Sequence, residues 1–169
     1  MQELRIEFIE VSRKSNSFTE SEKALFKKAL DVCENAYAPY SNFHVGAAIL
    51  LENQLFISGS NQENASFPCG VCAERTALFT AKSNYPNLKI IKIAITTKSR
   101  DFNNTNPVAP CGLCRQVLLE YEIKQKSDIE IYLFNKEKVI KLNRAKDLLP
   151  FYFTEERLKR KKHNNDKSF

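Results

Sequence analysis

The sequence predicts an α/β domain in which helices pack on a sheet. Strand-like runs alternate with helical segments along the chain, which is the pattern of layered α/β domains. A length of 169 residues fits a single domain, and no linker or internal repeat divides it. Hydrophobic residues at 43% and charged residues at 27% are ordinary proportions for a chain that buries its own core.

The hydrophobic periodicity justifies each element in order. Residues 4–11 (LRIEFIEV) alternate apolar and polar side chains, which predicts a half-exposed strand. Thr19 and Glu22 have the spacing of a capping box, and the apolar residues after them have helical spacing as far as Tyr37, shortly before Pro39. The remaining pattern predicts strands at 43–51, 54–60, 88–97, 129–134 and 138–142, helices at 70–82 and 112–122, a polar loop at 98–109 and a short helical piece near 144–149.

The net charge of +6 is concentrated toward the C-terminus. From Glu155 to Phe169 there are six basic and three acidic residues, so this stretch carries half of the excess. A solvated tail explains the composition. Non-specific attraction of Arg160, Lys161 and Lys162 to nucleic acid is the alternative, and no specific nucleic-acid partner is expected.

The cysteines and the N-terminal residues indicate the compartment. No apolar run approaches the roughly 20 residues of a membrane helix, so we expect no membrane partner. The start of the chain, MQELRIEFIEVSRKSNSF, lacks the basic, apolar and small-residue blocks of a signal peptide. Five cysteines is an odd number, and four of them form two C-x-x-C pairs, which favours metal or redox chemistry over a disulfide framework. We expect a cytoplasmic protein.

The two C-x-x-C pairs are the strongest chemical signal in the sequence. One is Cys69 to Cys72, followed by Ala73, Glu74 and Arg75, and the other is Cys111 to Cys114 after Pro110. Each pair stands at the start of a predicted helix, where backbone N–H groups and a partial positive charge favour thiolate over thiol. Zinc takes thiolates in tetrahedral geometry, so two such helix starts could share one ion.

The number of ligating cysteines decides between a structural and a catalytic site. Four ligands would close the site, whereas three leave a position for water. The separation of Cys72 from Cys111 is longer than the roughly 15–20 residues of a zinc ribbon and contains a predicted helix and strand. Glu74 also stands two residues past a ligand, close to the metal but poorly placed to bind beside it, as a proton acceptor for water requires. Three ligands are therefore favoured.

These residues resemble a known family, the homotetrameric zinc-dependent cytidine deaminases. In zinc deaminases a His or Cys stands two residues before a Glu, and a P-C-x-x-C motif follows later in the chain. Here the two parts are Cys72-Ala73-Glu74 and Pro110-Cys111-Gly112-Leu113-Cys114. Further blocks that resemble the family are YSNFHVGAA from Tyr40, NQENASFP from Asn61, CAERTA from Cys72 and LLPFYF from Leu148. Together the blocks cover about residues 37–153 and identify the family specifically, whereas a C-x-x-C motif alone would be a weak indication.

The resemblance implies a fold, an activity and an assembly. The fold is a three-layer α-β-α sandwich with a mixed five-stranded sheet over residues 21–154, with an N-terminal extension at 1–20 and a basic, mobile tail at 155–169. The activity is hydrolytic deamination of free cytidine, and of 2′-deoxycytidine, to uridine or 2′-deoxyuridine and ammonia, in pyrimidine salvage. The assembly is a homotetramer whose active sites are shared between subunits.

The resemblance also implies a role for each matched residue. Cys72, Cys111 and Cys114 hold one Zn²⁺ per chain, and zinc-bound hydroxide attacks C4 of the ring with Glu74 as the proton shuttle. Three thiolates on Zn²⁺ carry a net negative charge, and from the electrostatics we expect Arg75 and the two helix starts to offset part of it. The substrate-binding residues are Phe43 against the pyrimidine, Asn61 and Glu63 at the ribose hydroxyls, Ala73, and Phe67 and Phe153 reaching into a neighbouring subunit's pocket.

Plainer interpretations exist for several of these residues. Cys69 departs from the commonest family pattern and is either a bystander, a redox group or a fourth ligand that closes the site. Asn61 and Glu63 could be loop or capping residues, Glu74 an ordinary first-turn carboxylate, and the phenylalanines packing residues. Two other functions remain open: a deaminase acting on nucleic acid or another aminopyrimidine, and a non-catalytic zinc-ribbon-like module.

Overall fold

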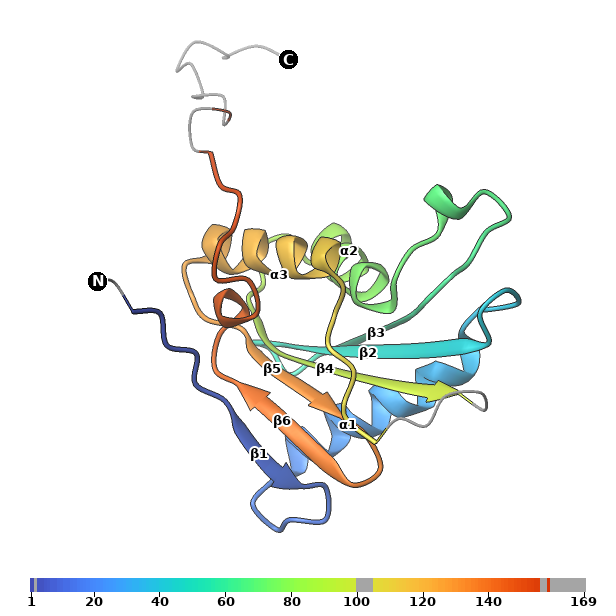
Figure 1. Ribbon diagram of the computed structural model, residues 1–169, viewed down its shortest axis with the longest axis horizontal. Coiled ribbons are helices and arrows are strands. Elements are labelled where there is room, and N and C mark those ends of the chain that lie inside the picture. Colours follow the sequence, from blue (N-terminus) through green and yellow to red (C-terminus); the bar gives the residue numbers. More distant parts are fainter. Residues whose placement is uncertain (2, 100–104, 156–157, 159–169) are drawn as a thin grey trace.

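The computed structural model describes residues 1, 3–99, 105–155 and 158. Within them, six strands form one mixed sheet in the order β1-β6-β5-β4-β2-β3 (Figure 1). The β4–β5 pair is parallel and the other pairs are antiparallel. The strands are β1 (Ile9–Ser12), β2 (Phe43–Leu51), β3 (Phe56–Ser60), β4 (Ile90–Ser99), β5 (Glu130–Phe134) and β6 (Lys138–Leu142).

The expected five-stranded sheet was wrong, because the N-terminal segment supplies a sixth strand. Ile9 pairs opposite Lys141 and Ser12 opposite Lys138, so β1 covers the edge that β6 would otherwise leave open. The alternating pattern at 4–11 did predict a strand, but only its end has a partner strand to pair with. Residues before Ile9 lie outside the ladder, and their apolar side chains are exposed.

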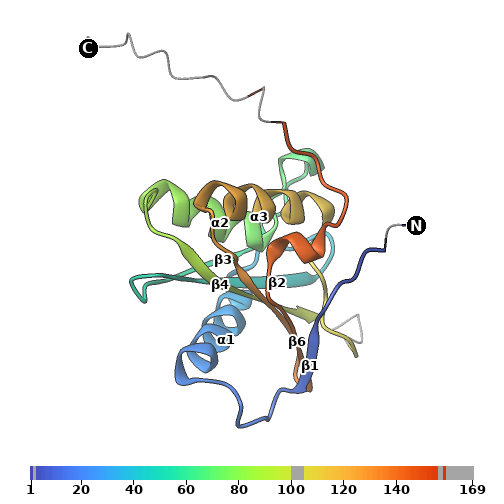
Figure 2. The same cartoon turned by 90° about the vertical axis from the view of Figure 1, so that its left-hand side faces the viewer.

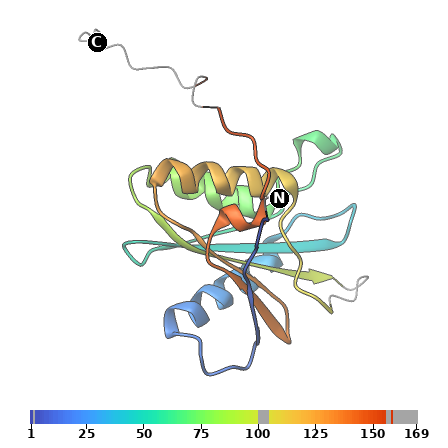
Figure 3. The ribbon, with the colours of Figure 1, turned by 60° about the vertical axis from the view of Figure 1, so that its left-hand side comes forward.

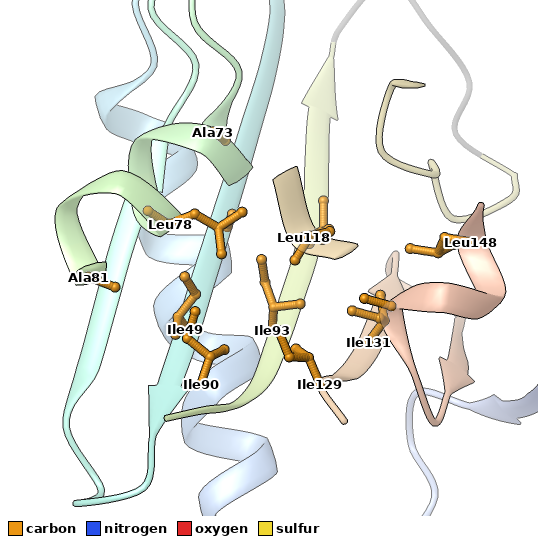
Figure 4. Close-up of a cluster of buried hydrophobic side chains, with 14 of the residues drawn as sticks. Ile49, Ala73, Leu78, Ala81, Ile90, Ile93, Leu118, Ile129, Ile131 and Leu148 are labelled. Carbon is orange, nitrogen blue, oxygen red and sulfur yellow. The ribbon is translucent and has the colours of Figure 1, made fainter. Parts of the chain in front are cut away.

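Helices cover both faces of the sheet. Helix α1 (Glu20–Val32) lies on one face, and α2 (Ala73–Asn84) and α3 (Gly112–Gln125) lie on the other (Figures 2 and 3). Two separate buried clusters fill the spaces between the layers. In the cluster on the α2 and α3 side, Leu78 and Leu118 meet Ile49 and Ile93 from the sheet (Figure 4). The arrangement is therefore three layers with the sheet in the middle.

Two glycines let the helices approach the sheet closely. A Cβ added at Gly46 in β2 would lie 2.0 Å from the Ala29 carbonyl oxygen of α1. One added at Gly59 in β3 would lie 2.5 Å from the Ala77 nitrogen and 2.7 Å from the Ala73 carbonyl oxygen of α2. Only a residue without a side chain allows these backbone approaches. The contact at Gly59 fixes the first turn of α2 against the sheet.

The helix boundaries confirm some expectations and shift others. The capping box is present: the Thr19 hydroxyl accepts from the Glu22 N–H at 3.2 Å, and the Glu22 carboxylate accepts from the Thr19 N–H at 2.9 Å. Helix α1 ends at Val32 and continues as a 3₁₀ turn to Asn35, before the expected end at Tyr37. Helix α2 begins at Ala73 rather than residue 70, because Val71 forms a β-bridge with Gln62.

The described residues include no helix that is both long and apolar enough to cross a bilayer. The basic residues at 157 and 159–162, on which the interpretation of the tail rests, lie outside the part of the chain that the structure describes.

Candidate functional site

A cavity of about 660 Å³ opens where the C-x-x-C pairs meet the sheet. Its wall comes from β2, the segment after β3, the 3₁₀ turn Phe67–Cys69, the start of α2, β4 and the loop before α3. Segments far apart in the sequence therefore converge on one space. The residues predicted from the sequence that line it are Phe43, Asn61, Glu63, Phe67, Cys72, Glu74 and Cys111.

Three cysteine sulfurs form a compact cluster at this cavity. The Sγ atoms of Cys72 and Cys111 are 3.8 Å apart and those of Cys111 and Cys114 are 3.4 Å apart, and all three lie within 4.8 Å of one another. Zn–S bonds of about 2.3 Å in a tetrahedron place neighbouring sulfurs about 3.8 Å apart. The donor set and its spacing therefore fit one zinc ion.

Cys69 is not a member of this cluster within the part of the chain that the structure describes. It ends the 3₁₀ turn Phe67–Cys69, is exposed, and its Sγ lies 3.5 Å from the Ser66 hydroxyl oxygen. The Val71–Gln62 bridge and the extended backbone of Cys72 separate that turn from α2. The first C-x-x-C pair thus contributes one sulfur, as expected for a site with three protein ligands.

Two of the sulfurs stand at helix starts. Cys72 is the N-cap of α2 and Cys111 the N-cap of α3, both with extended backbones and neither with a side-chain capping bond. Cys114 lies in the first turn of α3 and is buried. Because the sulfurs do not cap the helices, they remain available to a metal. The positive end of the α2 dipole favours the thiolate form of Cys72.

The electrostatics of the cluster favour a thiolate at Cys72. Hydrogen bonding with Cys114, then with Cys111 and Arg75, outweighs burial and lowers the pKa of Cys72 to about 5. The same hydrogen bond with Cys72, followed by burial, raises the pKa of Cys114. Burial lowers the pKa of Arg75, but its interactions with Cys72 and Cys114 prevail and raise it.

Glu74 is a buried carboxyl group next to the cluster. Its side chain sits in the first turn of α2, lines the cavity and is only 4% exposed. Burial raises the pKa of Glu74, and the negative charge of Cys72 raises it further, although its own backbone N–H, contact with Cys114 and Arg75 lower it. A carboxyl group whose pKa is raised toward neutral pH is suited to take up and release protons.

Asn61 and Glu63 are held by the segment that carries Phe43. The Asn61 side chain accepts from the Val45 N–H at 2.8 Å and donates to the Phe43 carbonyl at 2.9 Å. The Glu63 carboxylate accepts from the Ser41 hydroxyl at 2.5 Å, which is the largest cause of the lowered pKa of Glu63. The structure therefore brings Phe43, Asn61 and Glu63 together as one wall of the cavity.

The remaining predicted residues lie in different places. Phe67 lines the cavity rim, is 74% exposed and meets the Tyr40 ring edge-on at 5.6 Å between centroids. Ala73 is fully buried and does not line the cavity. Phe153 is 70% exposed and lies outside the cavity of its own chain, with its carbonyl accepting from the Gln116 amide at 2.9 Å.

Sequence reasoning missed several residues of the cavity. Ser41 was visible within the YSNF block, but its bond to Glu63 depends on a fold contact between segments more than 20 residues apart. Thr97 lines the cavity because it pairs opposite Val45 across β2 and β4. No local signal reports a cross-strand neighbour. Val108 and Ala109 directly precede Pro110-Cys111, so their position next to a ligand was a usable signal.

Comparison with known proteins places the chain in a family. Residues 19–127 match the family model described as the cytidine and deoxycytidylate deaminase zinc-binding region. The chain is 42% identical over 132 residues to the cytidine deaminase of Halalkalibacterium halodurans, covering 78% of this chain and 93% of that protein. It is 38% identical over 126 residues to that of Sporosarcina psychrophila, covering 74% and 85%.

Solved structures agree with the sequence comparison. The crystal structure of cytidine deaminase from Burkholderia pseudomallei superposes with a TM-score of 0.65 at 39% identity, covering 80% of this chain and all of that one. That of the Mycobacterium tuberculosis enzyme gives a TM-score of 0.63 at 29% identity, covering 82% and 100%. The three-sulfur cluster also lies at the two helix starts that carry the C-x-x-C motifs. The chain therefore belongs to the cytidine and deoxycytidylate deaminase zinc-binding family.

Proposed function

We propose that this chain is a zinc enzyme that deaminates free cytidine hydrolytically, giving uridine and ammonia. The observation that carries the proposal is a single cavity lined by Cys72 and Cys111 of the three-sulfur cluster, by Glu74, and by Phe43, Asn61 and Glu63. A metal site and a polar nucleoside wall thus face the same space. Relatives named as cytidine deaminases support the same activity.

The chemistry divides between the metal and the protein. Cys72, Cys111 and Cys114 would hold one zinc ion per chain, which supplies Lewis acidity that lowers the pKa of water. Glu74, in its buried position, takes one proton from the attacking water and passes it to N3 of the ring. It then takes the second proton from the hydroxyl added at C4 and delivers it to the amino group, which leaves as ammonia. Arg75, which interacts with the Cys72 sulfur, offsets part of the negative charge of three thiolates.

The other wall of the cavity accounts for selectivity toward nucleosides. Phe43 packs against the pyrimidine, and Asn61 and Glu63 hydrogen-bond sugar hydroxyls. A nucleic-acid strand fits this wall poorly, because its esterified 3′-oxygen has no proton to donate to Glu63. Free cytidine and 2′-deoxycytidine are therefore the proposed substrates, and pyrimidine salvage in the cytoplasm is the proposed setting.

The active form is proposed to be a homotetramer with shared sites. Phe67 and Phe153 are 74% and 70% exposed, so both rings are accessible to a neighbouring subunit. Phe67 stands at the rim of the cavity, where a neighbouring subunit could use it.

The direct test is the ultraviolet absorbance of cytidine in the presence of the purified protein. We expect the absorbance to change as uridine forms, a zinc chelator to stop the change, and added zinc to restore it. A short cytidine-containing oligonucleotide should remain unchanged. Zinc-loaded protein that leaves cytidine intact would contradict the proposal, and activity only on the oligonucleotide would favour a nucleic-acid deaminase.

A further inference from the structure

The carboxylate of Glu63 is almost fully engaged by its own chain. Its Oε2 atom accepts from the backbone N–H groups of Tyr40 at 2.9 Å and Ser41 at 3.3 Å, and its Oε1 atom accepts from the Ser41 hydroxyl at 2.5 Å. A carboxylate offers about four acceptor positions. The described residues therefore leave about one position free on Glu63, and it belongs to Oε1.

Asn61 is engaged in a similar way. Its Oδ1 atom accepts a hydrogen bond from one backbone N–H of β2, and its Nδ2 group uses one of its two N–H bonds to donate to a backbone carbonyl of β2. One N–H therefore remains for another partner. A hydroxyl that donates to Glu63 Oε1 and accepts from Asn61 Nδ2 would satisfy both groups at once. Each of the two residues therefore keeps one position for a hydroxyl of a ligand.

We propose that Ser41 is a positioning residue that fixes the Glu63 carboxylate so that its one free acceptor position meets one sugar hydroxyl of the nucleoside. The proposal rests on the proposed function, because it assumes that a nucleoside occupies the cavity. Ser41 also lines this cavity, and its hydroxyl oxygen accepts from the Phe43 N–H at 3.1 Å. The same hydroxyl thus connects the sugar-binding carboxylate to the backbone of the residue that packs on the base.

The geometry distinguishes this role from general support of the fold. Ser41 lies in an exposed turn before β2, away from both buried clusters. Glu63 keeps its two backbone N–H donors when the Ser41 side chain is removed. The substitution therefore removes only the hydrogen bond that orients Oε1. A hydrogen bond to a charged group is strong enough to change sugar recognition about tenfold.

The test compares substrates with and without the 2′- and 3′-hydroxyls of the sugar. For Ser41→Ala we expect KM for cytidine to rise about tenfold while kcat stays within about twofold. With 2′,3′-dideoxycytidine, kcat/KM of Ser41→Ala should match that of the wild type, because neither a 2′- nor a 3′-hydroxyl is available to recognise. Ser41→Thr keeps the hydroxyl and should restore most of the affinity for cytidine. Ser83→Ala on the exposed surface of α2 is the matched control and should change neither substrate.

A second arm tests whether Ser41 acts through Glu63. In a Glu63→Gln background, Ser41→Ala should add little to the rise in KM, since the carboxylate that it positions is gone. Equal losses on cytidine and dideoxycytidine would overturn the proposal and assign Ser41 to loop stability. Unchanged kinetics on cytidine would overturn it too. A wild-type protein inactive on cytidine would instead overturn the proposed function, and this proposal with it.

Discussion

At the scale of single residues, the two cysteines of the first C-x-x-C pair have different environments. Cys72 is half-buried at the start of α2, next to Cys111, whereas Cys69 is exposed in the preceding 3₁₀ turn. The pair shares a sequence motif but not a position. Glu74 gains its proposed role in the same way, because the first turn of α2 buries its carboxyl group against the sulfurs.

Glu74→Gln tests the proposed proton shuttle. The substitution keeps the shape of the side chain but removes its capacity to exchange protons, so we expect kcat to fall by a factor of about 10² or more. Zinc content should stay near one ion per chain, since the side chain is not a proposed ligand. Steady-state kinetics and metal analysis measure both quantities. Glu120→Gln, on the exposed surface of α3, should leave both unchanged; substantial turnover by Glu74→Gln would exclude the shuttle.

Much of the site could be predicted from the sequence, because several of its residues lie in short local motifs. Cys72, Glu74, Cys111 and Cys114 lie in short motifs whose spacing encodes chemistry, and the structure brings them together. Ser41 and Thr97 could not be predicted, because their places depend on a loop contact and on strand register. Ligand roles for the cysteines and substrate roles for Phe43, Asn61 and Glu63 remain predictions.

At the scale of elements, the site depends on how closely α2 approaches β3. Gly59 brings its Cα up to the backbone of Ala73 and Ala77, the first two turns of α2. Cys72 and Glu74 flank Ala73, so their position follows from this contact. A side chain at Gly59 would push the helix and two site residues away from the sheet together.

Gly59→Ala should therefore destabilise the protein and weaken metal binding. The added Cβ would meet backbone atoms at 2.5 and 2.7 Å, which cannot move without the helix, so we expect a loss of about 1–3 kcal/mol. Gly112→Ala is the matched control, because a Cβ there has nothing within 4 Å. Urea unfolding with zinc analysis measures the effect. Equal stability of the two variants would show that the close approach carries no cost.

The elements also show where sequence patterns lose information. The periodicity predicted every strand of the sheet, but it could not report that the strand in residues 4–11 joins β6. Family resemblance placed that strand in an extension and so gave a five-stranded sheet in place of six. The start of α2 moved to Ala73 because the Val71–Gln62 bridge competes with helical geometry, and a bridge between separate segments leaves no local pattern.

At the scale of the whole molecule, a buried ionic network joins α1 to the sheet. The Glu22 carboxylate accepts from Lys92 Nζ of β4 at 2.7 Å and from the Tyr132 hydroxyl of β5 at 2.5 Å. The Lys92 Nζ atom also lies 3.0 Å from Oε2 of Glu130. Burial alone would raise the pKa of Glu22, but hydrogen bonds from Lys92, Tyr132 and Thr19 prevail and lower it from 4.5 to about 2. The layer carried by α1 is therefore tied to the sheet by charge as well as by apolar packing.

This network predicts how stability depends on pH. Because the pKa of Glu22 is lower in the folded state, its contribution is fully present above about pH 4.5 and is lost as the pH falls toward 2. The contribution is on the order of 3 kcal/mol. Glu22→Gln should lower the free energy of unfolding at pH 7 and flatten its dependence on pH between 4.5 and 2. Glu20→Gln, in the same turn but exposed, should show the wild-type slope; a wild-type slope in Glu22→Gln would refute the assignment.

The proposed activity depends on a zinc ion held by three sulfurs rather than four. The most direct measurement is the zinc content and cytidine turnover of Cys69→Ser beside those of Cys111→Ser. Cys69→Ser should retain about one zinc per chain and most of the turnover, because its sulfur lies outside the cluster. Cys111→Ser should lose both. Loss of zinc from Cys69→Ser to the same extent as from Cys111→Ser would contradict the account.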